Sequence, residues 1–168
     1  MDNWKTAVGK AVVPGAMASV ASAAALALCA KKESGHMFAA ANAISHWLWG
    51  DQAFRQNGPT WKYTVLGYGI HHASSMFWAT LFEQAAGKML VRHSARTTLV
   101  ASAAATAVAC FVDYQMTPER LRPGYEERLS RRSLALVYAA FGIGLAAGSL
   151  INHQHQLPAS ENQTSANA

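Results

Sequence analysis

The sequence predicts an all-α integral membrane protein, a bundle of four membrane-spanning helices. Four apolar stretches approach the roughly 20 residues that a helix needs to cross a bilayer. Apolar residues make up 51% of the 168 residues and charged residues only 14%, well below the roughly 25% of soluble chains. A soluble helical bundle is the alternative, because alanine-rich helices occur in both classes. The predicted spans cover residues 11–30, 63–83, 97–114 and 133–152.

The first predicted span, 11–30, follows a short polar head and is uncharged up to Lys31. A cleaved signal peptide is the alternative, but this apolar run exceeds the 7–15 residues of a typical signal sequence. Small residues that let another helix approach closely recur every four positions along it: Gly15, Ser19, Ala23 and Ala27.

The connection to the second span contains the segment HMFAAANAISHWLWG, which is too short to cross a bilayer. We predict a short amphipathic or re-entrant helix here. Asn42, Ser45 and His46 are spaced i, i+3, i+4 and therefore share one face of that helix. Trp47 and Trp49 are suited to the headgroup level of the membrane.

The second predicted span, 63–83, carries two adjacent histidines, His71 and His72, followed by Ser74 and Ser75. Ionisable side chains at bilayer depth are costly and usually face a partner or a cavity. The other helices are therefore expected to shield these histidines from lipid.

The third predicted span, 97–114, is rich in alanine and ends at Asp113 and Tyr114. The fourth, 133–152, contains Gly144 and Gly148, a GxxxG pair that is typical of helix contacts. These spans complete one domain, residues 1–156. The polar tail, residues 157–168, is predicted to be disordered.

The distribution of basic residues predicts the orientation of the chain. Four spans place both termini on one side, which holds five basic residues: 5, 10, 88, 92 and 96. The opposite side holds nine: 31, 32, 55, 62, 120, 122, 128, 131 and 132. The positive-inside rule then places both termini outside and the two long connections in the cytoplasm. Four short spans with the polar NAISHWLWGD segment are similar in general look to small bacterial inner-membrane proteins.

Several functional classes find no support in the sequence. There is no basic stripe interleaved with aromatic residues, as nucleic-acid binding would need. The two cysteines lie in apolar runs without metal-ligand spacing. Phosphate loops, nucleophile elbows and dinucleotide fingerprints are absent. We therefore expect a non-enzymatic accessory or structural protein without a cofactor, whose partners are the lipid bilayer and another membrane protein or a second copy.

The candidate site is a polar intramembrane cluster: Asn42, His46, His71, His72, Ser75 and Asp113. One hypothesis is a metal or haem site built from His46, His71 and His72, because imidazole binds transition metals and haem iron. A second is a channel or proton-coupled transporter lined by His72, Ser75 and Asp113.

A structural interpretation stands beside both hypotheses. Adjacent helical residues point about 100° apart, so His71 and His72 cannot both face one metal well. They are then expected to form hydrogen bonds with serine, asparagine or backbone carbonyls. Asp113 is expected to be an interfacial charge that pairs with Arg120 or a neighbour, and Glu83 to be a charge at a helix end near Lys88.

Overall fold

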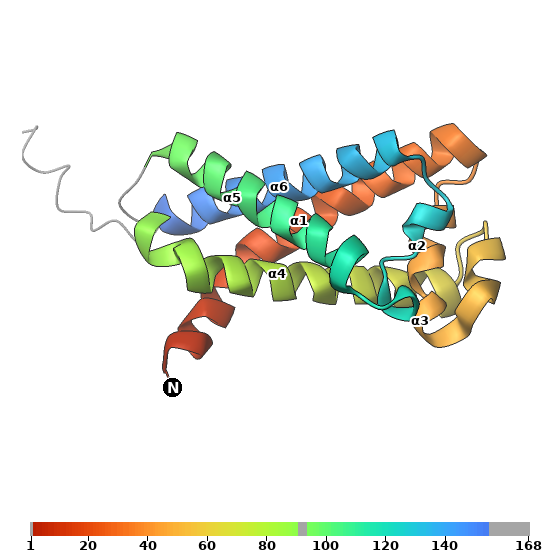
Figure 1. The fold of residues 1–168 in the computed structure, drawn as a ribbon, viewed down its shortest axis with the longest axis horizontal. Coiled ribbons are helices and arrows are strands. Elements are labelled where there is room, and N and C mark those ends of the chain that lie inside the picture. The colour runs from red at the N-terminus through yellow and green to blue at the C-terminus, as the bar shows by residue number, and fades with distance from the viewer. Residues whose placement is uncertain (1, 91–93, 155–168) are drawn as a thin grey trace, which may run out of the picture.

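The computed structural model describes residues 2–90 and 94–154, and within these ranges the chain is all-helical with no strand (Figure 1). Three helices are long and apolar enough to cross a membrane: Trp4–Ser34, Ala95–Met116 and Arg131–Asn152. These three helices identify a membrane protein and agree with the first, third and fourth predicted spans. The predicted tail, residues 157–168, lies outside the described residues.

Helix α1 (Asp2–Ser34) is longer than the predicted first span, because the head before residue 11 is helical as well. The first turns of α1 project away from the other helices (Figure 1). Trp4 and Val8 are exposed there. Pro14 lies inside the helix, where its missing N–H and its ring would usually kink the backbone.

Helix α6 (Arg131–Gln154) packs closely along α1. A Cβ atom at Gly144 would lie 2.7 Å from the Cα of Ala18, and one at Gly148 would lie 2.5 Å from the Cα of Pro14. The GxxxG pair is therefore a contact within the chain. At the other end of this pair of helices, the Glu33 carboxylate accepts hydrogen bonds from the N–H of Ser130 and from its hydroxyl.

Helix α4 (Leu66–Leu90) crosses the other side of α1 and is preceded by a π-helical turn, η2 (Trp61–Val65). A Cβ atom at Gly15 of α1 would lie 3.1 Å from the Cβ of Ala79 on α4, so these helices also meet through small residues. Glu83 is not at a helix end: it is buried inside α4, and Ser149 of α6 donates to its Oε1 at 3.2 Å. The expectation of a terminal charge near Lys88 is wrong because α4 continues to Leu90.

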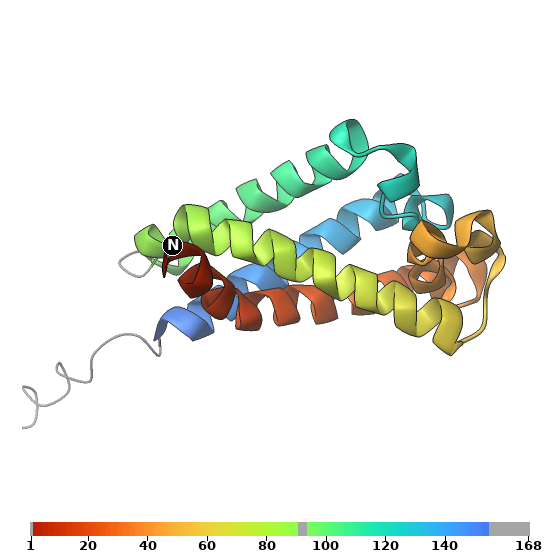
Figure 2. The same cartoon turned by 90° about the horizontal axis from the view of Figure 1, so that it is seen from below.

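Helix α5 (Ala95–Phe111) continues as a π-helical turn, η3 (Val112–Met116), and packs against α6. Its buried positions are small: Thr98, Ser102, Thr106 and Ala109. Gly142 of α6 makes room for Thr106, whose Oγ1 would lie 2.8 Å from a Cβ atom there. Figure 2 shows α5 and α4 diverging from their shared end.

The two long connections pack together at one end of the long helices and form what we call the cap (Figure 1). The predicted single short helix is broken into α2 (Ala39–Ile44), α3 (His46–Trp49) and a 3₁₀ helix, η1 (Gly50–Arg55). The second connection adds two 3₁₀ turns, η4 (Glu119–Leu121) and η5 (Tyr125–Glu127). Arg128 joins the connections by donating to the carbonyl of Phe54 and to Asn57.

Candidate functional site

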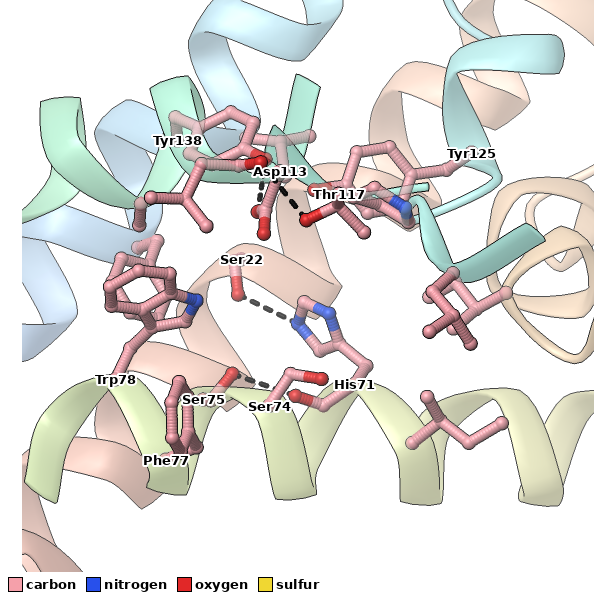
Figure 3. A pocket seen from close by; sticks show the side chains of 18 of the residues that line it. Ser22, His71, Ser74, Ser75, Phe77, Trp78, Asp113, Thr117, Tyr125 and Tyr138 are labelled. Atoms are coloured by element: carbon pink, nitrogen blue, oxygen red, sulfur yellow. Dashed lines mark hydrogen bonds between the residues drawn. The ribbon is translucent and has the colours of Figure 1, made fainter. Parts of the chain in front are cut away.

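A cavity of about 280 Å³ lies between α4, α5 and α6, next to the cap. Its polar side chains face one another across a mostly apolar space (Figure 3). His71 and Ser75 rise from α4, and Asp113 and Tyr138 lie on the opposite side. The apolar walls come from both the long helices and the cap, and include Ile44, Trp47, Ile70, Phe77, Trp78 and Phe141.

Asp113 lies in the π-helical turn that ends α5. The N–H and the hydroxyl of Thr117 both donate to the carbonyl of Val112 at 2.9 Å, and these bonds close the turn. Tyr138 of α6 donates to Oδ2 of Asp113 at 2.6 Å. The expected pairing with Arg120 is wrong, because the Arg120 guanidinium turns to the cap and donates to the carbonyl of Trp47 at 3.3 Å.

His71 forms one side of the cavity and also contacts α1. Its Nε2 lies 2.8 Å from Oγ of Ser22. The Ser22 hydroxyl also lies 2.7 Å from the carbonyl of Ala18, one turn earlier in α1. Ser75 donates to the carbonyl of His71 at 2.9 Å, so its hydroxyl hydrogen is used within α4.

His72 lies in the α1–α4 interface rather than in the cavity lining. Its Nδ1 is 3.0 Å from Oγ of the fully buried Ser19, and its ring lies 5.9 Å from that of Tyr68. The two histidines thus use two serines of α1 that are three residues apart. This is the serine-bonded arrangement that the structural interpretation expects, with the rings about a quarter-turn apart around α4.

The lining of the cavity reaches the outer surface of the molecule at Phe77 of α4. Phe77 lines the cavity and yet is 58% exposed, so its ring lies at the opening. Ala109 and Val112 line the cavity from α5, opposite this ring. The α5 side of the cavity belongs to the candidate span Ala95–Met116.

His46 is buried in the cap, away from the cavity. Its Nδ1 donates to the carbonyl of Ala43 at 3.0 Å, and its ring lies 5.0 Å from that of Phe54. Gly124 packs against the imidazole with a φ of +86°, and a Cβ atom there would lie 2.4 Å from Nδ1. A side chain is therefore excluded at position 124 both by the backbone conformation and by the ring.

A polar hollow on the cap is lined by His46 together with acidic and basic side chains, among them Arg122 and Glu126. Burial raises the pKa of the Glu126 carboxyl, opposed by nearby backbone N–H groups and by His46. Its Oε2 is buried without a hydrogen-bond partner among the described residues. Burial also raises the pKa of the Tyr125 phenol well above its usual value.

Asn42 is fully buried and holds the first connection in place. Its amide nitrogen donates to the carbonyls of Gln56 and Gly58 at 3.1 and 2.9 Å. Its Oδ1 accepts a hydrogen bond from Thr64 at 2.6 Å. Asn42 therefore connects α2 to the 56–58 turn and to the π-helical turn η2 through hydrogen bonds.

The structure divides the predicted polar cluster among three places. His71, Ser75 and Asp113 line the cavity, His72 lies between α1 and α4, and Asn42 and His46 lie in the cap. In residues 2–90 and 94–154, no three His, Cys, Asp or Glu side chains form a group that could hold a metal ion.

Among the cavity residues that sequence reasoning missed are Ser22, Trp78 and Tyr138. Ser22 could have been found, because it lies three residues after Ser19 and shares its helical face. Tyr138 is the partner of Asp113 from another helix. Nothing in the sequence of α6 marks it as such.

Searches of protein-family models, of curated proteins and of solved structures each gave no match to this chain.

Proposed function

We propose that the protein is a non-enzymatic membrane protein that binds a small amphipathic molecule from the bilayer. The observation that carries the proposal is the cavity beside the cap, whose lining includes the exposed ring of Phe77. Ligand sites are typically concave and mostly apolar, with a few placed polar groups that orient the ligand. The cavity has this composition, and its 280 Å³ suits a head group or a single ring rather than a whole lipid.

The proposal includes α4 as a fourth span, which completes a four-helix membrane bundle. Its 25 residues correspond to about 37 Å of helix at roughly 1.5 Å per residue, enough for the hydrocarbon core. Three ionisable side chains of α4 are directed to other helices: His71 to Ser22, His72 to Ser19 and Glu83 to Ser149. A helix with buried polar groups can be less apolar overall and still lie in lipid.

The proposed orientation places the cap in the cytoplasm of a bacterial inner membrane, with both termini outside. Both connections rich in Lys and Arg belong to the cap, so their charges lie on one side of the membrane. The positive-inside rule favours that side as cytoplasmic. The cavity, next to the cap, then opens towards the cytoplasmic leaflet.

The metal or haem hypothesis and the transport hypothesis remain predictions. His46, His71 and His72 each have a separate hydrogen-bond partner, and His46 lies in the cap. His71 and Asp113 share the cavity, which a transporter could use, but ligand binding requires only the cavity that is present.

The test uses a neutral amphipathic photoprobe, octanol carrying a diazirine, with the purified protein in zwitterionic lipid nanodiscs. Labelled residues are located by mass spectrometry after irradiation. We expect label on the cavity residues of α4 and α5. Ala109→Phe fills the cavity from α5 and should abolish that label. Ala104→Phe places the same side chain at an exposed position of α5 and should not.

Labelling that is spread evenly over the exposed faces of the helices would overturn the proposal. Equal labelling of the cavity in Ala109→Phe and in the unmodified protein would do the same. Thermal unfolding of both variants shows whether either has lost its fold.

A further inference from the structure

Three of the hydroxyl groups that line the cavity donate their hydrogens to other groups of the protein. Ser75 donates to the carbonyl of His71 at 2.9 Å, and Thr117 donates to the carbonyl of Val112 at 2.9 Å. Tyr138 donates to Asp113 at 2.6 Å. What these oxygens still offer to a ligand is lone pairs, so they act as acceptors. Ser74, Tyr125 and the Trp78 indole are other lining residues with a donor hydrogen.

The tautomer of His71 adds another acceptor. Ser22 has one hydroxyl hydrogen, and at 2.7 Å it donates to the carbonyl of Ala18. Ser22 then accepts from His71, which places the imidazole hydrogen on Nε2. This assignment follows from the hydrogen-bond network. It leaves Nδ1 of the neutral ring with a lone pair.

Asp113 gives the cavity a carboxylate without a neighbouring basic side chain. No Lys or Arg lines the cavity, and across the described residues Asp113 forms no ion pair. Arg120, the expected partner, is bonded to the cap instead. A carboxylate in such a mostly apolar site favours a partner of positive charge.

Aromatic rings supply the rest of the wall. Six of the lining side chains are aromatic: Trp47, Phe77, Trp78, Tyr125, Tyr138 and Phe141. The faces of such rings attract cations, and Trp is the strongest of them. A carboxylate, neutral acceptors and aromatic faces together describe a site for an organic cation with N–H donors.

We propose that the cavity binds lipophilic amines in their ammonium form. The ammonium group lies between Asp113 and His71, and the hydrocarbon part passes Phe77 into the bilayer. This inference rests on the proposed ligand-binding function and names the class of ligand.

The test compares four competitors with one decyl tail and different head groups against the diazirine octanol probe. Decylamine carries charge and N–H donors, decyltrimethylammonium carries charge alone, decanol is neutral and decanoate is an anion. We expect potency in that order, with decylamine at least about tenfold stronger than decanol, which corresponds to about 1.4 kcal/mol. Asp113→Asn should reduce the advantage of decylamine over decanol to about twofold or less.

The outcomes separate this inference from the function on which it rests. Cavity labelling that decanol and decylamine displace equally would overturn the amine specificity and leave the binding function standing. An amine preference that survives Asp113→Asn would also overturn it, because the preference would then come from membrane partitioning. The absence of any cavity labelling would overturn both the amine specificity and the proposed binding function. Thermal unfolding of Asp113→Asn, compared with that of the original protein, shows whether the variant keeps its fold.

Discussion

Tyr138 of α6 donates a hydrogen bond at 2.6 Å to Asp113 in η3, the π-helical turn that follows α5, and both residues line the cavity. Elsewhere the two helices meet through small side chains, such as Thr106 against Gly142. The bond therefore fixes the end of α5, where it diverges from α4, and holds the carboxylate at the edge of the cavity (Figure 3).

We predict that Tyr138→Phe lowers the stability of the protein by about 1–3 kcal/mol, because it removes the partner of a largely buried carboxylate. Thermal unfolding in mild detergent measures the change. Tyr68→Phe is the matched control: Tyr68 is 39% exposed on α4, and a surface change is usually within about 0.5 kcal/mol. Equal unfolding temperatures for the two variants would contradict the prediction.

We predict that Gly148→Ala destabilises the α1–α6 contact by about 1–3 kcal/mol, as overpacking usually does. The added methyl group would lie 2.5 Å from the Cα of Pro14, so the two backbones would have to separate. Gly148→Leu should have a larger effect. Thermal unfolding of the purified variants in mild detergent measures both losses of stability.

The control for this pair is Gly69→Ala in α4. No atom lies within 4 Å of a Cβ atom at Gly69. Alanine is also the better helix former by roughly 1 kcal/mol, so this variant should be as stable as the original protein or more stable. Destabilisation by Gly69→Ala equal to that by Gly148→Ala would show that close backbone packing is not the cause.

The sequence predicts local features well and partners poorly. The apolar runs of α1, α5 and α6 and the use of Gly144 and Gly148 in a helix contact follow from composition and spacing, whereas the partner helix, α1, does not. The partners of His71 and Asp113 are 49 and 25 residues away in the chain. Which polar groups meet depends on how the helices are rotated against one another, and that is decided by packing throughout the chain.

The cap shows the same limit. The i, i+3, i+4 spacing places Asn42, Ser45 and His46 on one face of a helix, but the chain breaks that helix at Ser45. The break lets Asn42 bind the carbonyls of the 56–58 turn, while His46 packs against Gly124 from the other connection. Long-range contacts of the cap therefore override a local helical pattern.

We predict that Gly124→Ala weakens the cap strongly, because the substitution combines a positive φ with a clash against the His46 ring. Hydrogen exchange of residues 119–130 should become faster. Gly35→Ala separates the two causes: its φ is +78°, but a Cβ atom there meets nothing within 4 Å. Gly35→Ala should therefore show the conformational cost alone. An equal loss of stability in both variants would exclude the clash with His46 as a cause.

We predict that Glu126→Gln stabilises the cap at neutral pH. Burial raises the pKa of the Glu126 carboxyl above its ordinary value of 4.5. At a pH between 4.5, the pKa in the unfolded chain, and the raised pKa in the folded protein, the folded protein keeps a proton that the unfolded chain has lost. The contribution of this group is therefore fully favourable below pH 4.5 and is lost as the pH rises through the folded pKa. The amide keeps the shape of the carboxyl without that loss.

The measurement is unfolding stability at several pH values for the original protein and for Glu126→Gln. We expect the amide variant to be more stable at pH 7.5, with the difference shrinking towards zero as the pH falls to 4.5. The opposite sign at pH 7.5 would mean that attraction between the carboxylate and His46 outweighs the cost of burial, since His46 and the backbone N–H groups oppose the raised pKa.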